Sequence, residues 1–188
     1  PFGHNSVRQK EGFRVRFPEH HQFEWTGYDT YYEHVMPQIE TILRRSLADP
    51  DEHYLIAINE AVCNAARYAT AGPEQAKIQI LMLLNDGDIK TIVQSDTRPF
   101  DVVRFRQQLR NLADDPELAH RDWGQYTAAS SKSRGYWIML MACDYIAIDV
   151  SGKRVTLCAK RPFRPWHIRK RIQNLVQRLY LERNGVIF

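Results

Sequence analysis

The stretch Ile56–Thr70 constrains the fold more than any other, because its apolar and polar residues separate at the helical period. Successive residues of an α-helix are rotated by about 100°, so residues three or four apart share a face. Glu60, Asn64 and Arg67 therefore stack along one side of a predicted helix, opposite an apolar stripe suited to a core. That stripe consists of Leu55, Ile58, Val62, Ala65 and Ala69.

The polar row on this helix has two interpretations. It is either a solvated helix face, or a functional row that supplies a carboxylate base, an amide oxygen for a cation and a guanidinium for a phosphate. The helix is expected to begin near Pro50, because Asp49 suits the N-cap and Glu52 the capping-box position. Gly72-Pro73 ends it shortly after Ala69.

Two pairs of apolar, β-rich runs predict two hairpins. Residues 76–84 and 89–94 are joined by Asn85–Asp88, and the Asp-Gly pair within this turn tolerates the positive φ angles that tight hairpins need. Residues 144–150 and 154–160 are joined around Ser151–Gly152. The sequence FRVRF at 13–17 alternates apolar and charged residues and predicts a further strand.

The other segments are predicted from helical periodicity or from its absence. Helices are expected over residues 30–47, with Pro37 in the interior, over 136–142 and over 166–183. Residues 102–133 are polar and mixed in charge, with a short possible helix near 102–112. A loop of this length inside a compact domain is usually a lid or an insertion. His20 and His21 lack a third ligand at a set spacing, so we expect no metal there.

Composition limits the class of protein. The chain has 188 residues, 44% of them hydrophobic and 26% charged, which suits one globular domain with or without an appendage. No apolar run approaches the roughly 20 residues needed to span a bilayer, and no secretory signal pattern is present. The three cysteines are scattered among apolar neighbours without metal-ligand spacing, which favours a reduced compartment. We therefore expect a cytoplasmic protein.

The net charge of +4 is concentrated at one end of the chain. Residues 161–188 contain seven basic residues and one acid, a net charge of +6, so the remainder carries about −2. We expect the predicted helix 166–183 to pack against the domain or a dimer partner, with its arginines solvated. An acidic protein, a nucleic-acid backbone and a membrane surface remain alternatives, and nucleic acid is not the partner that we expect.

Three motifs occur in an order that resembles the GHKL family of ATP-binding domains. Residues 60–68, EAVCNAARY, resemble the N-box E-x-x-x-N-A-x-x-H. Residues 95–101, SDTRPFD, are similar to a first glycine box, D-x-G followed by P-F-D. Residues 133–139, SRGYWIM, are similar to a second glycine box, G-R-G-L followed by an apolar helix. The resemblance covers about residues 13–160 and is closest to the anti-sigma-factor serine kinases.

The resemblance implies a role for each motif. Asn64 would ligate Mg²⁺, and Glu60 would orient or deprotonate the attacking hydroxyl or water. Asp96 would accept a hydrogen bond from the adenine amino group. Gly135 would let backbone N–H groups approach the phosphates at a helix N-terminus. The other residues assigned to nucleotide binding are Arg67 in the N-box and Lys132, Ser133 and Arg134 at the closing end of an ATP lid over 102–131.

The chain also departs from the family pattern. Arg98 stands where the first box has glycine, Ser133 where the second box has its first glycine, and Tyr68 where the N-box has histidine. Each motif also has a purely structural explanation, in which Asn64 hydrogen-bonds a loop, Asp96 is a turn residue and Gly135 is a loop-to-helix junction. The alternative to an enzyme is thus a degenerate GHKL fold that acts as a non-enzymatic protein-interaction module.

These observations predict an α+β two-layer sandwich of the Bergerat type. A mixed, mainly antiparallel sheet of about five strands is covered on one face by helices. The expected organisation is a loose N-terminus over 1–12, a histidine-kinase-like ATPase domain over 13–160 and a basic amphipathic helical extension over 161–188. The expected function is that of an ATP- and Mg²⁺-dependent serine/threonine protein kinase that acts on a regulatory partner of the sigma-factor or antagonist type.

Overall fold

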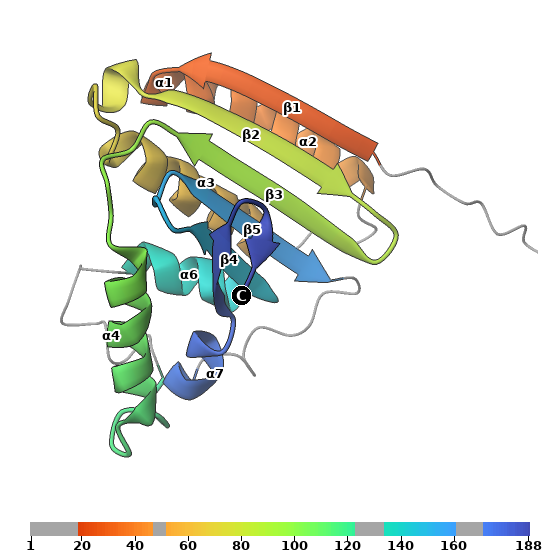
Figure 1. Cartoon of the computed structure of the whole chain (residues 1–188). Helices are drawn as coiled ribbons and strands as arrows, with labels where there is room; N and C mark the ends of the chain where they lie inside the picture. Colours follow the sequence, from red (N-terminus) through yellow and green to blue (C-terminus); the bar gives the residue numbers. More distant parts are fainter. Residues whose placement is uncertain (1–18, 47–51, 123–133, 161–170) are drawn as a thin grey trace, which may run out of the picture.

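A computed structural model describes residues 19–46, 52–122, 134–160 and 171–188. Its centre is one seven-stranded sheet in the order β1-β2-β3-β5-β4-β6-β7. Every neighbouring pair is antiparallel except β4 and β6, which are parallel. Helices α2 (Met36–Ser46), α3 (Glu52–Arg67) and α6 (Arg134–Ala142) lie on one side of the sheet (Figure 1). Helices α4 (Val102–Asp114) and α7 (Ile172–Val176) lie near one another at one end. The prediction of a mixed, mainly antiparallel sheet with helices is confirmed, whereas the estimate of about five strands was too low.

The first three strands form an antiparallel ribbon. β1 (Glu19–Thr26) pairs with β2 (Lys77–Leu84), and β2 pairs with β3 (Asp88–Ser95). The predicted hairpin is confirmed: Leu84 is opposite Ile89, and the Asn85 N–H donates to the Asp88 carbonyl oxygen at 2.9 Å. Buried residues alternate with more exposed ones along β2 and β3, so one face of the ribbon points into the core.

The second predicted hairpin is also confirmed. It joins β4 (Tyr145–Asp149) to β5 (Arg154–Lys160), and Gly152 in the connecting turn has a positive φ of 76°. β5, not β4, lies beside β3. The end of β3 and the β4–β5 turn are therefore adjacent, as the hydrogen bond from the Ser95 N–H to the Lys153 carbonyl oxygen at 3.0 Å shows.

The prediction of one helix over residues 166–183 is wrong for its C-terminal part, which forms a strand. Residues 166–170 lie outside the described part, α7 spans only Ile172–Val176, and Leu179–Arg183 form strand β6. β6 pairs in parallel with β4 and continues into β7 (Val186–Ile187). The turn between them suits Asn184 and Gly185, which have φ angles of 51° and 81°. The C-terminal residues thus extend the sheet.

A buried carboxylate fixes β6 to the rest of the sheet. Glu182 is 7% exposed, and its Oε1 accepts a hydrogen bond from Nη2 of Arg154 on β5 at 2.5 Å. Its Oε2 accepts another from the Thr156 hydroxyl at 3.2 Å. Because β4 lies between β5 and β6, these contacts reach across a whole strand.

The helical segment before the motif helix is continuous but contains a wider turn. α1 (Tyr28–Thr30), a π-helical turn (Tyr31–Val35) and α2 (Met36–Ser46) follow one another without a break. Pro37 cannot donate to the helix ladder and would crowd the preceding turn of a regular α-helix, and the π turn lies just before it. The Gln38 amide donates to the His34 carbonyl oxygen at 2.7 Å. The predicted helix is confirmed as far as the described residues extend.

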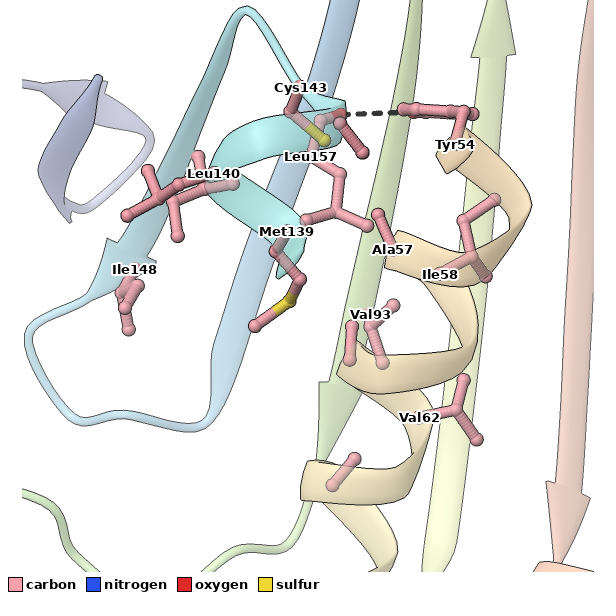
Figure 2. Packing of buried hydrophobic residues seen from close by; sticks show 14 of the residues in the cluster. Tyr54, Ala57, Ile58, Val62, Val93, Met139, Leu140, Cys143, Ile148 and Leu157 are labelled. Carbon is pink, nitrogen blue, oxygen red and sulfur yellow. Dashed lines mark hydrogen bonds between the residues drawn. The ribbon is translucent and has the colours of Figure 1, made fainter. Parts of the chain in front are cut away.

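Helix α3 (Glu52–Arg67) carries the centre of the core. Tyr54, at its start, is fully buried; its hydroxyl donates to the Thr91 hydroxyl at 3.0 Å and lies 3.3 Å from the Leu157 carbonyl oxygen (Figure 2). Ala57, Ile58 and Val62 are 0% exposed and pack on the sheet. The predicted N-cap residues lie outside the described part. After α3, Gly72 has a φ of 88°, consistent with the predicted end of the helix.

Two further expectations concern the N-terminal strand and membrane-spanning helices. The strand predicted at 13–17 lies outside the described residues, whereas β1 begins at Glu19 and was not predicted. Across the described ranges, no helix has the length and apolar character that a transmembrane span requires.

Candidate functional site

Helices α3 and α6 bring the N-box and the second glycine box together. α6 spans Arg134–Ala142 and packs against α3. A Cβ atom added to Gly135 would lie 2.7 Å from Oε2 of Glu60 and 3.2 Å from Nδ2 of Asn64. Both side chains of the N-box thus contact the backbone of the glycine at the first turn of α6. A contact as short as 2.7 Å excludes any larger residue at position 135 unless Glu60 moves.

Apolar packing holds these two helices at this distance. Trp137, Met139 and Leu140 of α6 are 0% exposed and share one core cluster with α3. Figure 2 shows Met139 and Leu140 in the same cluster as Ala57, Ile58 and Val62. The α3 positions Ala57, Ala61 and Ala65 are buried alanines one turn apart, and small side chains allow helices to approach closely. The site is therefore built on rigid, buried elements.

The side-chain nitrogen of Asn64 lacks a partner within the described part of the chain. This atom, Nδ2, is buried. The alternative explanation was that Asn64 hydrogen-bonds a neighbouring loop. Within the described residues, Nδ2 of Asn64 makes no such hydrogen bond. Buried polar atoms without partners are uncommon and often mark a place where a ligand or an ion binds.

The residues around Gly135 fit a magnesium–phosphate group. An amide oxygen and a carboxylate are hard oxygen ligands of the kind that Mg²⁺ prefers. The N-terminal end of α6 offers backbone N–H groups and a positive dipole end to anions. Glycine at position 135 permits close approach of a ligand to this backbone.

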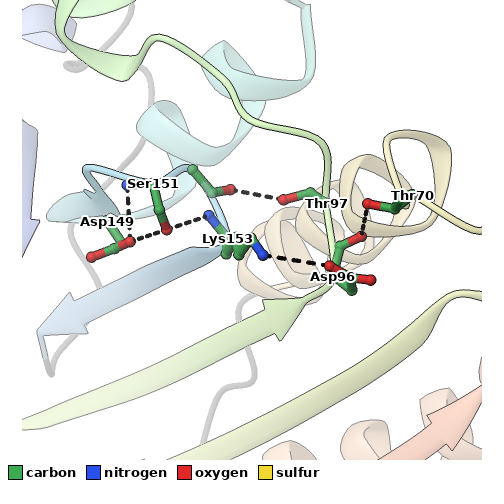
Figure 3. A network of polar contacts seen from close by, with 7 residues as sticks. Thr70, Asp96, Thr97, Asp149, Ser151 and Lys153 are labelled. Atoms are coloured by element: carbon green, nitrogen blue, oxygen red, sulfur yellow. Dashed lines mark hydrogen bonds and ion pairs between the residues drawn. The ribbon is translucent and has the colours of Figure 1, made fainter.

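Asp96 lies directly after β3, at the strand end that the sequence predicted. Its carbonyl oxygen accepts hydrogen bonds from the Thr70 N–H at 2.8 Å and the Thr70 hydroxyl at 3.1 Å. Its side chain is 62% exposed, and Oδ1 lies 3.5 Å from Nζ of Lys153 (Figure 3). The backbone is thus fixed to the end of α3, while the carboxylate pairs with a lysine that the sequence analysis did not single out.

The rest of the first box connects three segments. The Arg98 N–H donates to the Tyr68 carbonyl oxygen at 2.9 Å, which ties the box to the end of α3. The Thr97 hydroxyl donates to the Gly152 carbonyl oxygen at 3.2 Å (Figure 3). A Cβ on Gly152 would lie 3.0 Å from Cβ of Phe100, so the β4–β5 turn packs against the box.

An aromatic cluster links the first box to the second. α4 (Val102–Asp114) follows Asp101, whose side chain caps the helix by accepting from the Arg104 N–H at 2.9 Å. The ring centroid of Tyr136 lies 4.8 Å from that of Phe105 and 6.3 Å from that of Phe100. Burial, and secondarily Tyr68, raises the pKa of Tyr136 to about 12. Sequence reasoning missed Phe105 and Tyr136, because their contact depends on the tertiary fold.

The remaining predicted site residues are placed only in part. Arg67 is exposed on the last turn of α3. Burial raises the pKa of Tyr28 on α1, and the charge of Arg67 opposes this shift only weakly. Lys132 and Ser133 lie outside the described residues, and for Arg134 only its place at the start of α6 is described. In the predicted lid, residues 102–114 form α4, and residues 123–131 lie outside the described part.

Neither a metal-binding cluster among the described residues nor a known relative indicates a function for this site. In the described part of the chain, no three His, Cys, Asp or Glu side chains are grouped so that they could hold a metal ion. No protein-family model matches the sequence, and no curated protein matches it either. The geometry of the site and the three sequence motifs are therefore the observations that indicate its function.

Proposed function

We propose that this protein binds Mg·ATP between α3 and α6 and acts as a serine/threonine protein kinase on a regulatory partner protein. The single observation that carries the proposal is the contact of Gly135 with Glu60 and Asn64. Residues of two distant motifs meet at a helix N-terminus, and they have the chemistry that a phosphate-bound cation requires. By resemblance to anti-sigma-factor kinases, the partner would be of the sigma-factor or antagonist type.

Each residue then has a defined role. Asn64 contributes an oxygen ligand to Mg²⁺, and the backbone at Gly135 lies against the phosphates. ATP supplies the transferable phosphoryl group. Glu60 accepts the proton of the acceptor hydroxyl as that oxygen attacks, which is general-base catalysis at a positioned carboxylate.

Asp96 serves as the acceptor for the adenine amino group in this proposal. Its present partner, Lys153, is at 3.5 Å, and the two side chains are 62% and 50% exposed. Ion pairs of this kind contribute little, because water screens them. The adenine amino group can therefore replace Lys153 at small cost.

A non-enzymatic interaction module is the second candidate. The observation that favours it is the Arg98 N–H, which is bonded to the Tyr68 carbonyl oxygen at 2.9 Å. In the family pattern this position is a glycine whose backbone approaches the nucleotide, whereas here a long side chain stands there and the N–H is already used. In that case the protein would bind its partner without nucleotide.

Calorimetric titration of ATP, with and without Mg²⁺, separates the two candidates. The proposal predicts Mg²⁺-dependent binding that Asn64→Ala and Asp96→Ala each weaken by about tenfold or more. Asn111→Ala, at an exposed asparagine on α4, is the matched control and should bind as the wild type does. Glu60→Gln should retain binding but lose phosphoryl transfer. No binding by the wild-type chain would reject the kinase and favour the interaction module.

A further inference from the structure

Helix α4 presents two arginines on one side that no described carboxylate pairs with, and a third arginine, Arg104, lies on a different side of the helix. Arg106 and Arg110 are one helical turn apart, so their side chains share one side of the helix. Among the described residues, neither forms an ion pair with an acidic side chain, and Nε of Arg106 is buried without a hydrogen-bond partner. Two like charges one turn apart repel, and Asp114, one turn after Arg110, offsets this at only one end of the pair, so an anion bound against both guanidinium groups would be favoured.

The titration of Arg106 is consistent with this geometry. Its pKa is lowered, first by burial and then by the charge of Arg110, while Tyr180 of β6 opposes the shift. α4 also contacts β6, the strand that carries Tyr180. Val103, three residues before Arg106 and on the same side of α4, is 58% exposed, and Tyr180 is 36% exposed. The surface thus combines two guanidinium groups with an aliphatic and an aromatic side chain.

Acidic residues limit this surface at both ends of α4. Asp101 caps the helix at its start, and Asp114, Asp115 and Glu117 follow at its end. The basic surface therefore covers about two turns of helix. That length suits a short segment with a few carboxylates, whereas the repeated phosphates of a nucleic acid would also meet the flanking acids.

We propose that the surface formed by Val103, Arg106, Arg110 and Tyr180 is a docking site for a short acidic, partly apolar segment of a partner protein. Carboxylates spaced one helical turn apart match the two guanidinium groups, and arginine binds carboxylates through paired, charge-assisted hydrogen bonds. Apolar side chains of the segment cover Val103 and the ring of Tyr180. The site is independent of the proposed nucleotide site, and docking needs no ATP.

Fluorescence anisotropy with synthetic helical peptides tests this proposal on the full chain. The probe is a labelled alanine-based peptide with one Glu-x-x-x-Glu pair and flanking leucines, and its matched peptide has glutamine in place of glutamate. The glutamate peptide should bind without nucleotide, and the glutamine peptide should bind at least about fivefold more weakly. Arg106→Gln and Arg110→Gln should each weaken glutamate-peptide binding by a similar factor. Arg45→Gln, at an exposed arginine on α2, should not.

A charge exchange guards against variants that simply unfold. The Arg106→Glu/Arg110→Glu double variant should lose the glutamate peptide and gain binding to a peptide with lysines at the same positions. Equal binding of the glutamate and glutamine peptides, or an equal effect of Arg45→Gln, would overturn the proposal. Tighter binding of a duplex DNA of mixed sequence at the same salt, lost in the Arg106 and Arg110 variants, would also overturn it and identify a nucleic-acid surface.

Discussion

Gly135 and Glu60 are in contact although they belong to different motifs and different helices. A Cβ atom on Gly135 would lie 2.7 Å from the Glu60 carboxylate oxygen, a distance that real Cβ atoms essentially never show. A larger residue at the first turn of α6 would therefore require the Glu60 carboxylate, the end of a flexible side chain, to move. This relationship gives Gly135 a steric role in addition to the phosphate contact that its motif implies.

The first prediction concerns this contact. Gly135→Ala should displace the Glu60 side chain and weaken Mg·ATP binding by about tenfold or more, because the added methyl group fills the place where ligand and carboxylate meet. The fold should persist, since a displaced carboxylate can turn toward solvent. Calorimetric titration measures the affinity and circular dichroism the fold. Gly87→Ala, at a glycine with nothing within 4 Å of an added Cβ, is the control. Wild-type affinity in Gly135→Ala would contradict the assigned site.

The second prediction separates function from stability at Asn64. Its Nδ2 is buried without a partner among the described residues, so its amide should contribute little to folding. Removing an unsatisfied buried polar group can be neutral or stabilising. We expect Asn64→Ala to change the free energy of unfolding by less than about 1 kcal/mol while weakening Mg²⁺-dependent ATP binding by about tenfold or more. Urea unfolding and calorimetry on the same preparations check both parts. A loss of several kcal/mol would mean that the amide has a structural role.

The third prediction is a pH dependence caused by Tyr136. Burial and the neighbouring Tyr68 raise its pKa from 10.0 to about 12. Because the folded-state pKa exceeds the unfolded one, the contribution to stability is complete below pH 10 and disappears as the pH rises through about 12. The wild type should lose about 2 kcal/mol more stability than Tyr136→Phe over this range. Urea unfolding at several pH values measures the difference, with Tyr180→Phe, at an exposed tyrosine on β6, as the control. Parallel losses in wild type and Tyr136→Phe would contradict the prediction.

Local patterns in the sequence predicted the elements that depend on neighbouring residues, namely the hairpins and the main helices. Both hairpins and the helices around the motifs follow from apolar periodicity, turn residues and glycine positions. β1 was missed because only two of its less exposed positions, Phe23 and Trp25, are apolar, whereas His21 is polar, so the alternation is short. β6 was mistaken for helix because Leu179 fits both periods, and only pairing with β4 decides between them.

For the candidate site, the sequence supplied candidate residues but not their contacts with other segments. The motifs predicted Glu60, Asn64, Asp96 and Gly135 as site residues, and the structure brings Gly135 against Glu60 and Asn64, while the roles of all four stay predictions. Their contacts with other segments were not predictable, because they arise when distant segments pack. The pairing of Asp96 with Lys153 and the stacking of Phe100 on Tyr136 are examples. Neither has a signature at a fixed sequence spacing.

The last prediction concerns the strand that the sequence did not indicate. Glu182 on β6 is 7% exposed and receives hydrogen bonds from Arg154 and Thr156 across β4. Glu182→Leu should destabilise the protein by about 3 kcal/mol, because it leaves the Arg154 guanidinium partly buried without its partner. Urea unfolding measures the change.

Arg154→Met/Glu182→Leu should recover much of that loss, since replacing both members of a buried pair by apolar groups is often nearly neutral. The double variant thus separates the cost of an unpaired charge from the contribution of the pair itself. The matched control is Arg44→Met, which removes the exposed ion pair with Glu40 on α2 and should change stability by less than about 1 kcal/mol. Equal stability losses in Arg44→Met and Glu182→Leu would mean that Glu182 does not hold β6 in the sheet.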